Sequence, residues 1–349
     1  MSQTVICNQN NALEHFDNLI QLLSGMYVSK AIYVAAKLGI ADLLKDGAKS
    51  SDELAKATEV DAQFLYRLLR ALASVNIFIE VGDRYFELTP LATYLQIDAF
   101  GSMRSMALAM GEDWNWQCLG NLFNAIKTGI PAFEHQFGMS MFDYFVEHPE
   151  LGKNYYQAMT DYSEIINHAI LDVYDFPTIS KLVDVGGGYG ALFTAILKAN
   201  PAITGILFDL PSVIERAKKA DFFHNKELAG RYELVGGDFF ESVPSGGDIY
   251  IIKLAIHNWD DHRANKILQN CYQAMPPNGK LLVIEPVVPS GNERYFGVKL
   301  MDLQMLIGTD GGRERTADEF EKLFIEAGFR LTKVIPTKSS CSIVEGVKI

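Results

Sequence analysis

One stretch of the sequence, residues 181–209, limits the possible folds more than any other. A mostly apolar run over 182–185 predicts a buried strand, and the glycine cluster over 186–190 predicts a tight loop. Apolar residues then recur at helical spacing over 191–200, and a second strand ends at Asp209. We therefore expect the first βαβ unit of a nucleotide-binding α/β sheet, with its ligand at the carboxyl ends of the strands.

Asp184 helps to decide which nucleotide this loop would bind. The pattern Gly186-x-Gly188-x-x-Ala191 fits the dinucleotide fingerprint, and Asp209 stands where a ribose-binding acid belongs. A carboxylate at Asp184 would repel a pyrophosphate, but it suits a ligand that carries an ammonium group and a sulfonium. S-adenosylmethionine (SAM) has both and no phosphate, so we expect SAM. A glycine-rich turn without a ligand is the alternative.

Length and composition narrow the class of protein. A chain of 349 residues favours two domains, and 48% hydrophobic with 21% charged residues allows a large core. A formal charge of -12 makes nucleic acid a poor partner. Without a basic leader or an apolar stretch that we judge long enough to span a bilayer, we expect a cytoplasmic protein. The four cysteines are scattered, which indicates reduced structural thiols.

The N-terminal third predicts a mainly helical domain. Residues 12–38 have helical spacing with more than one apolar face, which means burial within one subunit or a dimer contact, and we favour the dimer. A capping box at 50–53, a helix beginning after Asp61 and a hairpin over 77–88 give the order of a winged helix. The second helix offers only Arg67 and Arg70 as basic groups, so scaffolding or dimerisation is favoured over DNA binding.

Two further segments complete the chain. Residues 100–175 predict helices rich in aromatic residues and methionine, which suit either a core or the wall of a pocket for a flat, apolar substrate. Strands and helices then alternate, which indicates a mainly parallel sheet covered on both faces. The strands are expected at 232–235, 249–254, 281–288, 331–336 and 342–347, and the helices at 210–219, 260–275, 296–307 and from a capping box at 316–319.

With these motifs in view, nearly the whole chain resembles the SAM-dependent O-methyltransferases of the caffeate/hydroxyindole type, including bacterial members that methylate secondary metabolites. The motifs are Val-Asp-Val-Gly-Gly-Gly-x-Gly at 183–190, Phe-Asp-Leu-Pro at 208–211, Gly-Asp-Phe-Phe at 237–240, His-Asn-Trp-Asp-Asp at 257–261 and Gly-Gly-Arg-Glu-Arg-Thr at 311–316. The resemblance implies a Rossmann-like class I methyltransferase sheet, a winged-helix dimerisation domain, a homodimer and SAM. We expect domains at 1–100 (dimerisation), 101–176 (helical, lining the substrate pocket) and 177–349 (SAM-binding).

The resemblance also implies roles for individual residues. His257 matches the catalytic base, and Glu285 and Glu314 match two acids beside it. Residues matched to the cofactor are Ser163, Asp184, Gly186, Gly188, Asp209, Leu210, Asp238, Phe239 and Lys253. Residues matched to the substrate are Trp116, Tyr155, Met159, Asn258, Met305 and Thr309. Thr309-Asp310 stands where plant relatives have Asn-Pro, and Tyr155 where they have Phe, so plant substrate specificity is not carried over.

The chemistry supports these roles without the family. Methyl transfer to a hydroxyl needs a group that removes its proton, and His257 follows a strand at the carboxyl edge of the sheet. A carboxylate on its far nitrogen would fix the tautomer, and Glu285 with Glu314 suits that task. Structural alternatives remain open: a capping or buried histidine at His257, a core acid at Glu285, turns at Asp209 and Asp238, and core packing for Met159 and Met305.

Other functions remain to be weighed. His257 and His262 lack the spacing of a helical metal site, and Asp260-Asp261 suits a helix start, so we expect no metal. Competing classes are an NAD-dependent oxidoreductase, a ligand-sensing DNA-binding protein, and relatives that methylate nitrogen or carry out decarboxylation or hydroxylation.

Overall fold

The computed structural model describes residues 9–176, 180–219, 223, 225–291 and 296–349. The chain divides into two compact units, Met1–Trp116 with Lys153–Asp161, and Gln117–Gly152 with Tyr162–Ile349. The long helix α10, Pro149–Leu171, contributes to both units. The domain boundaries expected at 100/101 and 176/177 stay predictions. Cys7 lies outside the described residues, whereas Cys118, Cys271 and Cys341 are free and buried.

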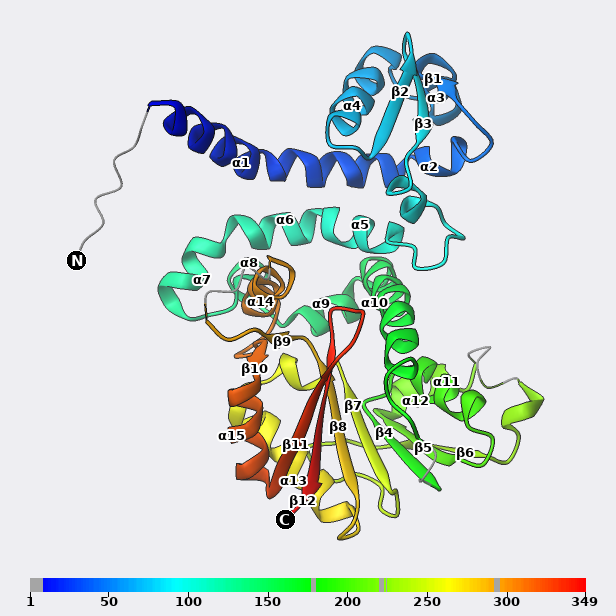
Figure 1. Cartoon of the computed structure of the whole chain (residues 1–349), viewed down its shortest axis with the longest axis vertical. Coiled ribbons are helices and arrows are strands. Elements are labelled where there is room, and N and C mark those ends of the chain that lie inside the picture. Colours follow the sequence, from blue (N-terminus) through cyan, green and yellow to red (C-terminus); the bar gives the residue numbers. More distant parts are fainter. Residues whose placement is uncertain (1–8, 177–179, 220–222, 224, 292–295) are drawn as a thin grey trace. The chain divides into compact units, whose positions relative to one another are not determined.

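The first unit has the expected order of helix, helix and hairpin (Figure 1). Ser50 caps α3 (Ser51–Thr58) in a complete capping box with Glu53, and Asp61 accepts a hydrogen bond from the amide of Phe64 to start α4 (Ala62–Ser74). The hairpin consists of β2 (Phe78–Gly82) and β3 (Tyr85–Leu88), and the two-residue β1 (Lys49–Ser50) pairs with β3. The remaining described helices are α1 (Gln9–Lys37), α2 (Ile40–Leu43), η1 (Ala92–Leu95), α5 (Arg104–Gly111) and the first half of α6 (Asp113–Gly120).

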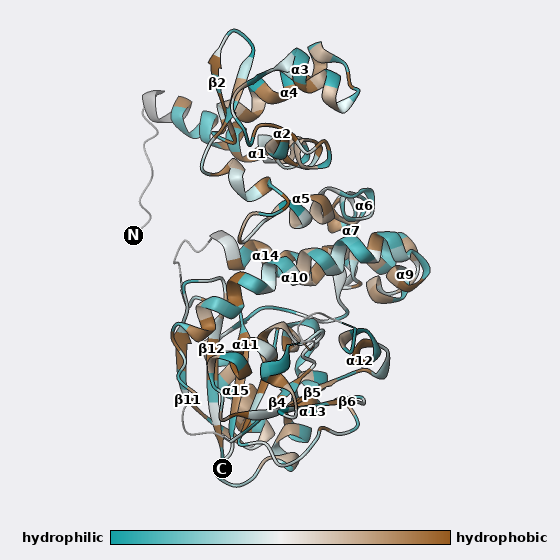
Figure 2. Cartoon of the chain, turned by 90° about the vertical axis from the view of Figure 1, so that its right-hand side faces the viewer, coloured by the Kyte–Doolittle hydropathy of each residue, from teal (hydrophilic) through white to brown (hydrophobic). Residues whose placement is uncertain are grey.

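Helix α1 corrects one expectation from the sequence. Its stretch Leu13–Lys37 is long and apolar enough to cross a membrane, with a mean hydropathy of 1.3, although we expected no such stretch. Glycine, serine and asparagine lie between the apolar residues, as the mixed colouring of the helix illustrates (Figure 2). The high mean hydropathy is therefore not obvious from the sequence. The large apolar side chains that the single chain leaves exposed on this helix are Leu13, Phe16, Leu19, Ile20, Leu22, Leu23, Met26 and Tyr27.

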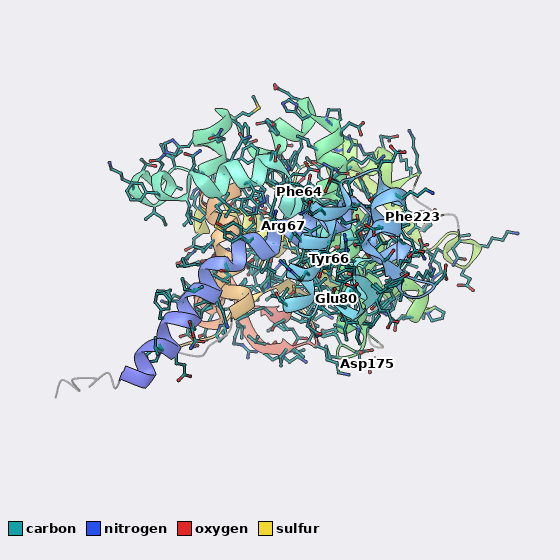
Figure 3. All side chains as sticks on the ribbon, turned by 90° about the horizontal axis from the view of Figure 1, so that it is seen from above. Phe64, Tyr66, Arg67, Glu80, Asp175 and Phe223 are labelled. Carbon is teal, nitrogen blue, oxygen red and sulfur yellow. The ribbon has the colours of Figure 1, made fainter. Side chains whose placement is uncertain are left out.

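The two arginines of α4 lie against aromatic rings. The guanidinium of Arg67 is 5.7 Å from the ring centre of Phe64, and that of Arg70 is 5.6 Å from the ring centre of Tyr66. Phe64, Tyr66 and Arg67 are labelled in Figure 3. Such cation–π contacts add modest stability at exposed sites, so these basic groups already have a partner within the fold.

The second unit is built on a seven-stranded sheet in the order β11-β12-β8-β7-β4-β5-β6. Strands β4 (Lys181–Val185), β5 (Thr204–Asp209), β6 (Tyr232–Gly236), β7 (Ile249–Lys253) and β8 (Lys280–Glu285) run parallel. The last two strands, β11 (Phe329–Pro336) and β12 (Ser342–Lys348), are antiparallel. This arrangement confirms the predicted α/β fold class, with its mainly parallel sheet.

Helices cover both faces of this sheet. One apolar cluster joins the strands to α10, α11 (Ala191–Ala199) and α12 (Pro211–Ala217), and the other joins them to α13 (Asp261–Ala274) and α15 (Ala317–Ala327). Figure 1 shows the two helix groups on opposite sides of the sheet. The other helices among the described residues of this unit are α7 (Leu122–Thr128), α8 (Ala132–Phe137), α9 (Met141–Glu147), η3 (Lys226–Leu228), η4 (Ile256–Asn258) and α14 (Phe296–Gly308).

The prediction of a single strand over 281–288 is wrong. Strand β8 ends at Glu285, and after Pro286 the short strand β9 (Val287–Val288) pairs with β10 (Arg315–Thr316) instead. Proline has no amide hydrogen to donate to a neighbouring strand, so the ladder breaks there. The break turns the chain toward the segment that contains Glu314.

Gly205 gives a test of how closely α11 packs on β5. A Cβ at this position would lie 2.5 Å from the Phe193 ring and 3.0 Å from the carbonyl oxygen of Leu182. We expect Gly205→Ala to lower the free energy of unfolding by about 1–3 kcal/mol through overpacking. Urea denaturation measures the loss. Gly120→Ala, where a Cβ meets nothing within 4 Å, is the control, and equal stability of the two variants would contradict this packing.

Candidate active site

The turn between β4 and α11 leaves no room for a side chain beneath it. A Cβ at Gly187 would lie 2.4 Å from the Leu207 side chain and 2.6 Å from the carboxyl group of Asp184. Gly188 has φ +61°, a left-handed conformation that favours glycine, and a Cβ there would meet nothing within 4 Å. The loop therefore packs tightly on the sheet below and has open space above Gly188.

Asp209, at the end of β5, fixes this loop. Its Oδ2 accepts a hydrogen bond from the amide of Gly188 at 2.8 Å, and its Oδ1 accepts one from the amide of Leu210 at 2.7 Å. Burial raises the pKa of Asp209, and the two amide hydrogen bonds act in the opposite direction. Each carboxylate oxygen has two acceptor positions, so this turn-forming role leaves capacity for a ribose hydroxyl.

Asp184 is a buried carboxyl group with an unsatisfied oxygen. Only 2% of the residue is exposed, and its Oδ1 has no hydrogen-bond partner among the described residues. Burial raises the pKa of Asp184 to about 7, against the influence of Lys253, which lowers it. A buried acid with a free oxygen beneath a bare glycine loop fits a cationic ligand, because a nearby positive charge favours the carboxylate.

Lys253, at the end of β7, connects the sheet to α10. Its ammonium group donates hydrogen bonds to Ser163 Oγ and Asn167 Oδ1, both at 2.7 Å. Burial lowers the pKa of Lys253 to about 8, while Asp184 raises it. Lys253 and Ser163, which the resemblance assigned to the cofactor, therefore lie together. Asn167 was missed, although it stands one helical turn after Ser163, a spacing that the sequence already contains.

Two predicted residues follow β6. Asp238 Oδ1 accepts a hydrogen bond from the amide of Phe240 at 2.8 Å, which is the turn-forming role left open above. The Phe239 ring lies 3.5 Å from the position of a Cβ on Gly186, so it borders the glycine loop. It also packs edge-on against Phe240 and Trp259. Phe239 thus forms an apolar wall beside the loop.

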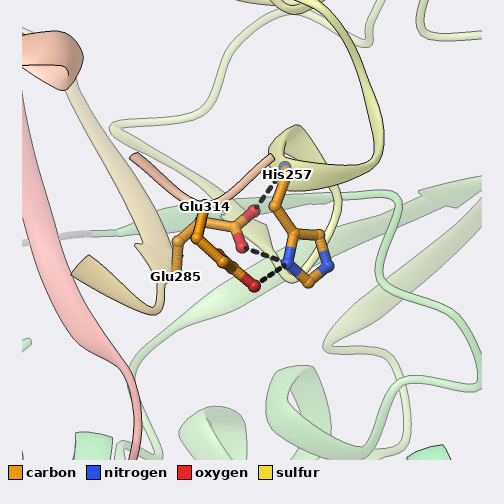
Figure 4. Close-up of side chains that lie close together, drawn as sticks. All are labelled: His257, Glu285 and Glu314. Atoms are coloured by element: carbon orange, nitrogen blue, oxygen red, sulfur yellow. Dashed lines mark hydrogen bonds and ion pairs between the residues drawn. The ribbon is translucent and has the colours of Figure 1, made fainter. Parts of the chain in front are cut away.

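His257, Glu285 and Glu314 meet at the carboxyl edge of the sheet, as predicted (Figure 4). His257 Nδ1 lies 2.9 Å from Glu314 Oε1 and 3.4 Å from Glu285 Oε2. Glu285 Oε1 accepts hydrogen bonds from the amides of Ala255 and Ile256 at 3.0 and 2.9 Å. Figure 4 shows the other ring nitrogen, Nε2, directed away from both carboxylates.

Two acidic side chains lie beside the imidazole of His257 and change its pKa. Burial lowers the pKa of His257, but Glu285 and Glu314 outweigh burial and raise it to about 9. Burial also raises the pKa of Glu285, whose side chain is fully enclosed. Ligand-type atoms of these three residues lie within 4.8 Å of one another, so they also have the composition of a divalent-metal site. The expectation of no metal stays a prediction.

The six predicted substrate residues are divided between the two units. Asn258, Met305 and Thr309 belong to the second unit, where the Asn258 amide donates to the Leu254 carbonyl at 3.4 Å and the Thr309 hydroxyl to the Met305 carbonyl at 2.6 Å. The other three, Trp116, Tyr155 and Met159, are half-buried in the first unit. The shared role of the six stays a prediction.

Comparisons with known proteins agree with this geometry. Residues 116–330 match the O-methyltransferase domain family, and residues 20–97 match the O-methyltransferase dimerisation domain family. The chain is 44% identical to the phenazine O-methyltransferase PhzM of Lysobacter antibioticus over 97% of this chain and 98% of that one. It is 34% identical to a phenazine-1-carboxylate N-methyltransferase of Pseudomonas aeruginosa, over 93% and 95% of the two chains.

The solved structure of a relative supports SAM as the cofactor. The methyltransferase CalO1 of calicheamicin biosynthesis, in its SAH-bound form, matches with a TM-score of 0.87 and 36% identity over 97% of this chain and 99% of that one. The dimerisation family also accounts for the apolar helix α1, most of which lies within the matched residues. The sequence left SAM and NAD as the two candidate cofactors. The match to this family supports SAM. The chain therefore belongs to the SAM-dependent O-methyltransferase family whose members carry an N-terminal dimerisation domain.

Proposed function

We propose that this protein methylates a hydroxyl group of a small aromatic metabolite, with His257 as the general base and Glu285 and Glu314 as the acids that orient it. The observation that carries the proposal is the imidazole with Nδ1 held between two buried acids and Nε2 directed away from them. A hydroxyl acceptor carries a proton that must leave during methyl transfer. A ring nitrogen with a free lone pair carries none and needs no base.

The raised pKa of His257 would make its neutral form, which is the minor form near pH 7, a stronger base toward a hydroxyl acceptor. Proton transfer from a phenol of pKa about 10 to an ordinary imidazole of pKa about 6.5 is uphill by about 5 kcal/mol. With the His257 pKa at about 9, the same transfer is uphill by only about 1.4 kcal/mol. Glu314 would hold the Nδ1 proton, so that Nε2 receives the proton from the acceptor.

The cofactor residues fit SAM, which supplies a methyl group on positively charged sulfur. We infer that Asp184 and the glycine loop hold its cationic end, because Asp184 has a free buried oxygen there. Asp209 and Asp238 would bind its polar groups, and Phe239 would give an apolar wall. Leu210 follows Asp209 directly and would border the same site, and Lys253 would act with Ser163.

The relatives suggest a first set of acceptors. Because two of the relatives reported above are named for O-methylation and N-methylation of phenazines, hydroxyphenazines and phenazine carboxylates should be compared with simple phenols. Isotope-labelled SAM and mass spectrometry would identify the methylated atom. Transfer only to ring nitrogen would reject the hydroxyl proposal, and a mass loss of carbon dioxide or a gain of oxygen would support decarboxylation or hydroxylation instead.

Removing the base should abolish most turnover without affecting the cofactor. We expect His257→Gln to reduce the methylation rate by about 10²- to 10⁴-fold, the usual contribution of general-base catalysis. Calorimetry should find an unchanged affinity for S-adenosylhomocysteine. His262→Gln, an exposed histidine on α13, is the control. Full activity of His257→Gln would reject the base, and loss of parent activity on treatment with a metal chelator would favour the metal site.

Asp184 should make cofactor affinity depend on pH. Its carboxyl group has a pKa of about 7, so it is charged above pH 7 and loses its attraction for a cation below it. We expect the affinity for S-adenosylhomocysteine to fall as the pH drops from about 8 to about 6. Asp184→Asn should bind weakly with little change over this range, whereas the exposed control Asp175→Asn should behave like the parent protein. Parent-like binding by Asp184→Asn would contradict the assignment.

The exposed apolar residues of α1 should join two subunits in a homodimer. Leu19 and Leu23 are 56% and 62% exposed in the single chain and lie one helical turn apart. We expect the double variant Leu19→Glu, Leu23→Glu to be monomeric, because pairing would bury four new carboxylates. Light scattering coupled to size exclusion measures the mass. Gln21→Glu controls for added charge, and a double variant that stays dimeric would place the interface elsewhere.

A further inference from the structure

The loop between β7 and α13, residues 254–260, contains His257. It is held from one side by the segment 311–315, which we name the clasp. The amide of Arg313 donates a hydrogen bond to the carbonyl oxygen of His257 at 2.8 Å. A Cβ on Gly312 would lie 2.6 Å from that same carbonyl oxygen, so the two backbones approach more closely than any side chain at 312 would allow. The clasp thus contacts the main chain of His257 as well as its ring.

Arg315 contacts the backbone of the His257 loop through its side chain. Its guanidinium donates to the carbonyl oxygen of Ile256 at 3.3 Å and to that of Trp259 at 2.8 Å, one residue before His257 and two residues after it. Its Nε and Nη2 both donate to Asp261 Oδ1, at 3.0 and 2.8 Å. The side chain is only 1% exposed. A single rigid group therefore ties both ends of the loop to the N-terminus of α13.

We propose that Arg315 is a positioning residue for His257, which fixes the loop so that the imidazole meets Glu314. Glu314 and Arg315 are neighbours in an extended segment, so their side chains leave it on opposite sides. One reaches the ring of His257 and the other reaches the backbone on either side of it. The segment is itself fixed, because Arg315 is paired with Val287 in β9, two residues after Glu285.

A neutral side chain could fill this space but could not replace these contacts. Burying a guanidinium is costly, and a well-packed apolar residue often supports a fold equally well. The planar fork of arginine, however, can bond two carbonyls and a carboxylate at fixed angles, which lysine cannot do with its single ammonium group. The position of Arg315 thus favours control of loop geometry over a simple gain in stability.

The pKa of His257 distinguishes the two possible roles of Arg315. A purely structural role would leave this pKa unchanged. Within the part of the chain that the structure describes, the charged groups that act on the His257 ring are Glu285 from β8 and Glu314 from the clasp. Together with a hydrogen bond to the Leu254 backbone, they raise its pKa to about 9. Loss of the positive charge of Arg315 would by itself raise this pKa further. Loss of positioning would instead move the ring away from the acids and lower the pKa toward about 6.5. The two effects have opposite signs.

The experiment measures the pKa of His257 by NMR on full-length protein labelled at histidine. We expect Arg315→Ala to lower it from about 9 to below about 8 and to reduce turnover at least tenfold, with added guanidinium restoring part of both. Arg313→Ala is the matched control, because it removes a neighbouring charge and an ion pair with Asp261 but no side-chain contact to the loop carbonyls. Its His257 pKa should not fall.

An unchanged or raised pKa in folded Arg315→Ala would overturn the proposal. If that variant does not fold, Arg315→Lys serves in its place and should show the same fall to a smaller extent, with an unchanged pKa again overturning it. The catalytic consequence rests on the proposed function, but the NMR readout does not. An active His257→Gln together with a lowered pKa in Arg315→Ala would reject His257 as the base and leave the positioning role intact.

Discussion

The burial of Glu285 is the constraint on which the site depends. Its side chain is completely enclosed at the end of β8, where a carboxylate is stable only if its oxygens are compensated. One oxygen accepts amide hydrogen bonds from Ala255 and Ile256, and the other faces the imidazole of His257. These bonds turn the chain that leaves β7 back over the end of β8. Glu285 thus accepts hydrogen bonds from the backbone of this loop and helps to raise the pKa of the imidazole that the loop carries.

A buried carboxyl group that needs a positively charged partner occurs twice along one edge of the sheet. Asp184 on β4 and Glu285 on β8 are both buried acids near strand ends, separated by β7 with its half-buried Lys253. Asp184 Oδ1 and Glu285 Oε2 both lack a hydrogen bond among the described residues. Glu285 Oε2 lies 3.4 Å from the imidazole of His257, whereas Asp184 Oδ1 is left for an incoming cation. Parallel strands bring such groups to one edge, where low polarity strengthens each interaction.

The sequence predicted the local features well and the distant ones incompletely. Periodicity and capping signals located the βαβ unit, the N-cap at Asp61 and both capping boxes, because each depends on residues within a few positions. The meeting of His257, Glu285 and Glu314 followed from the parallel topology together with the family resemblance. The partners of Arg315 lie 54 to 59 residues away and are mostly backbone carbonyls, which leave no mark in residue types. The break after Glu285 was missed because Pro286 was included in an apolar run.

The ionisation of His257 explains why a buried arginine is useful beside it. The folded-state pKa of about 9 exceeds the ordinary value of about 6.5, so pairing with the acids adds stability that is complete below pH 6.5 and is lost as the pH rises through 9. A general base, however, must be neutral when it accepts a proton. In that form His257 no longer attracts the two carboxylates as a cation, and the ring is oriented by neutral hydrogen bonds such as the one to Glu314. The contacts of Arg315 with the carbonyls of Ile256 and Trp259 do not change with this ionisation, so under the proposed mechanism they would hold the loop while neutral His257 accepts the proton.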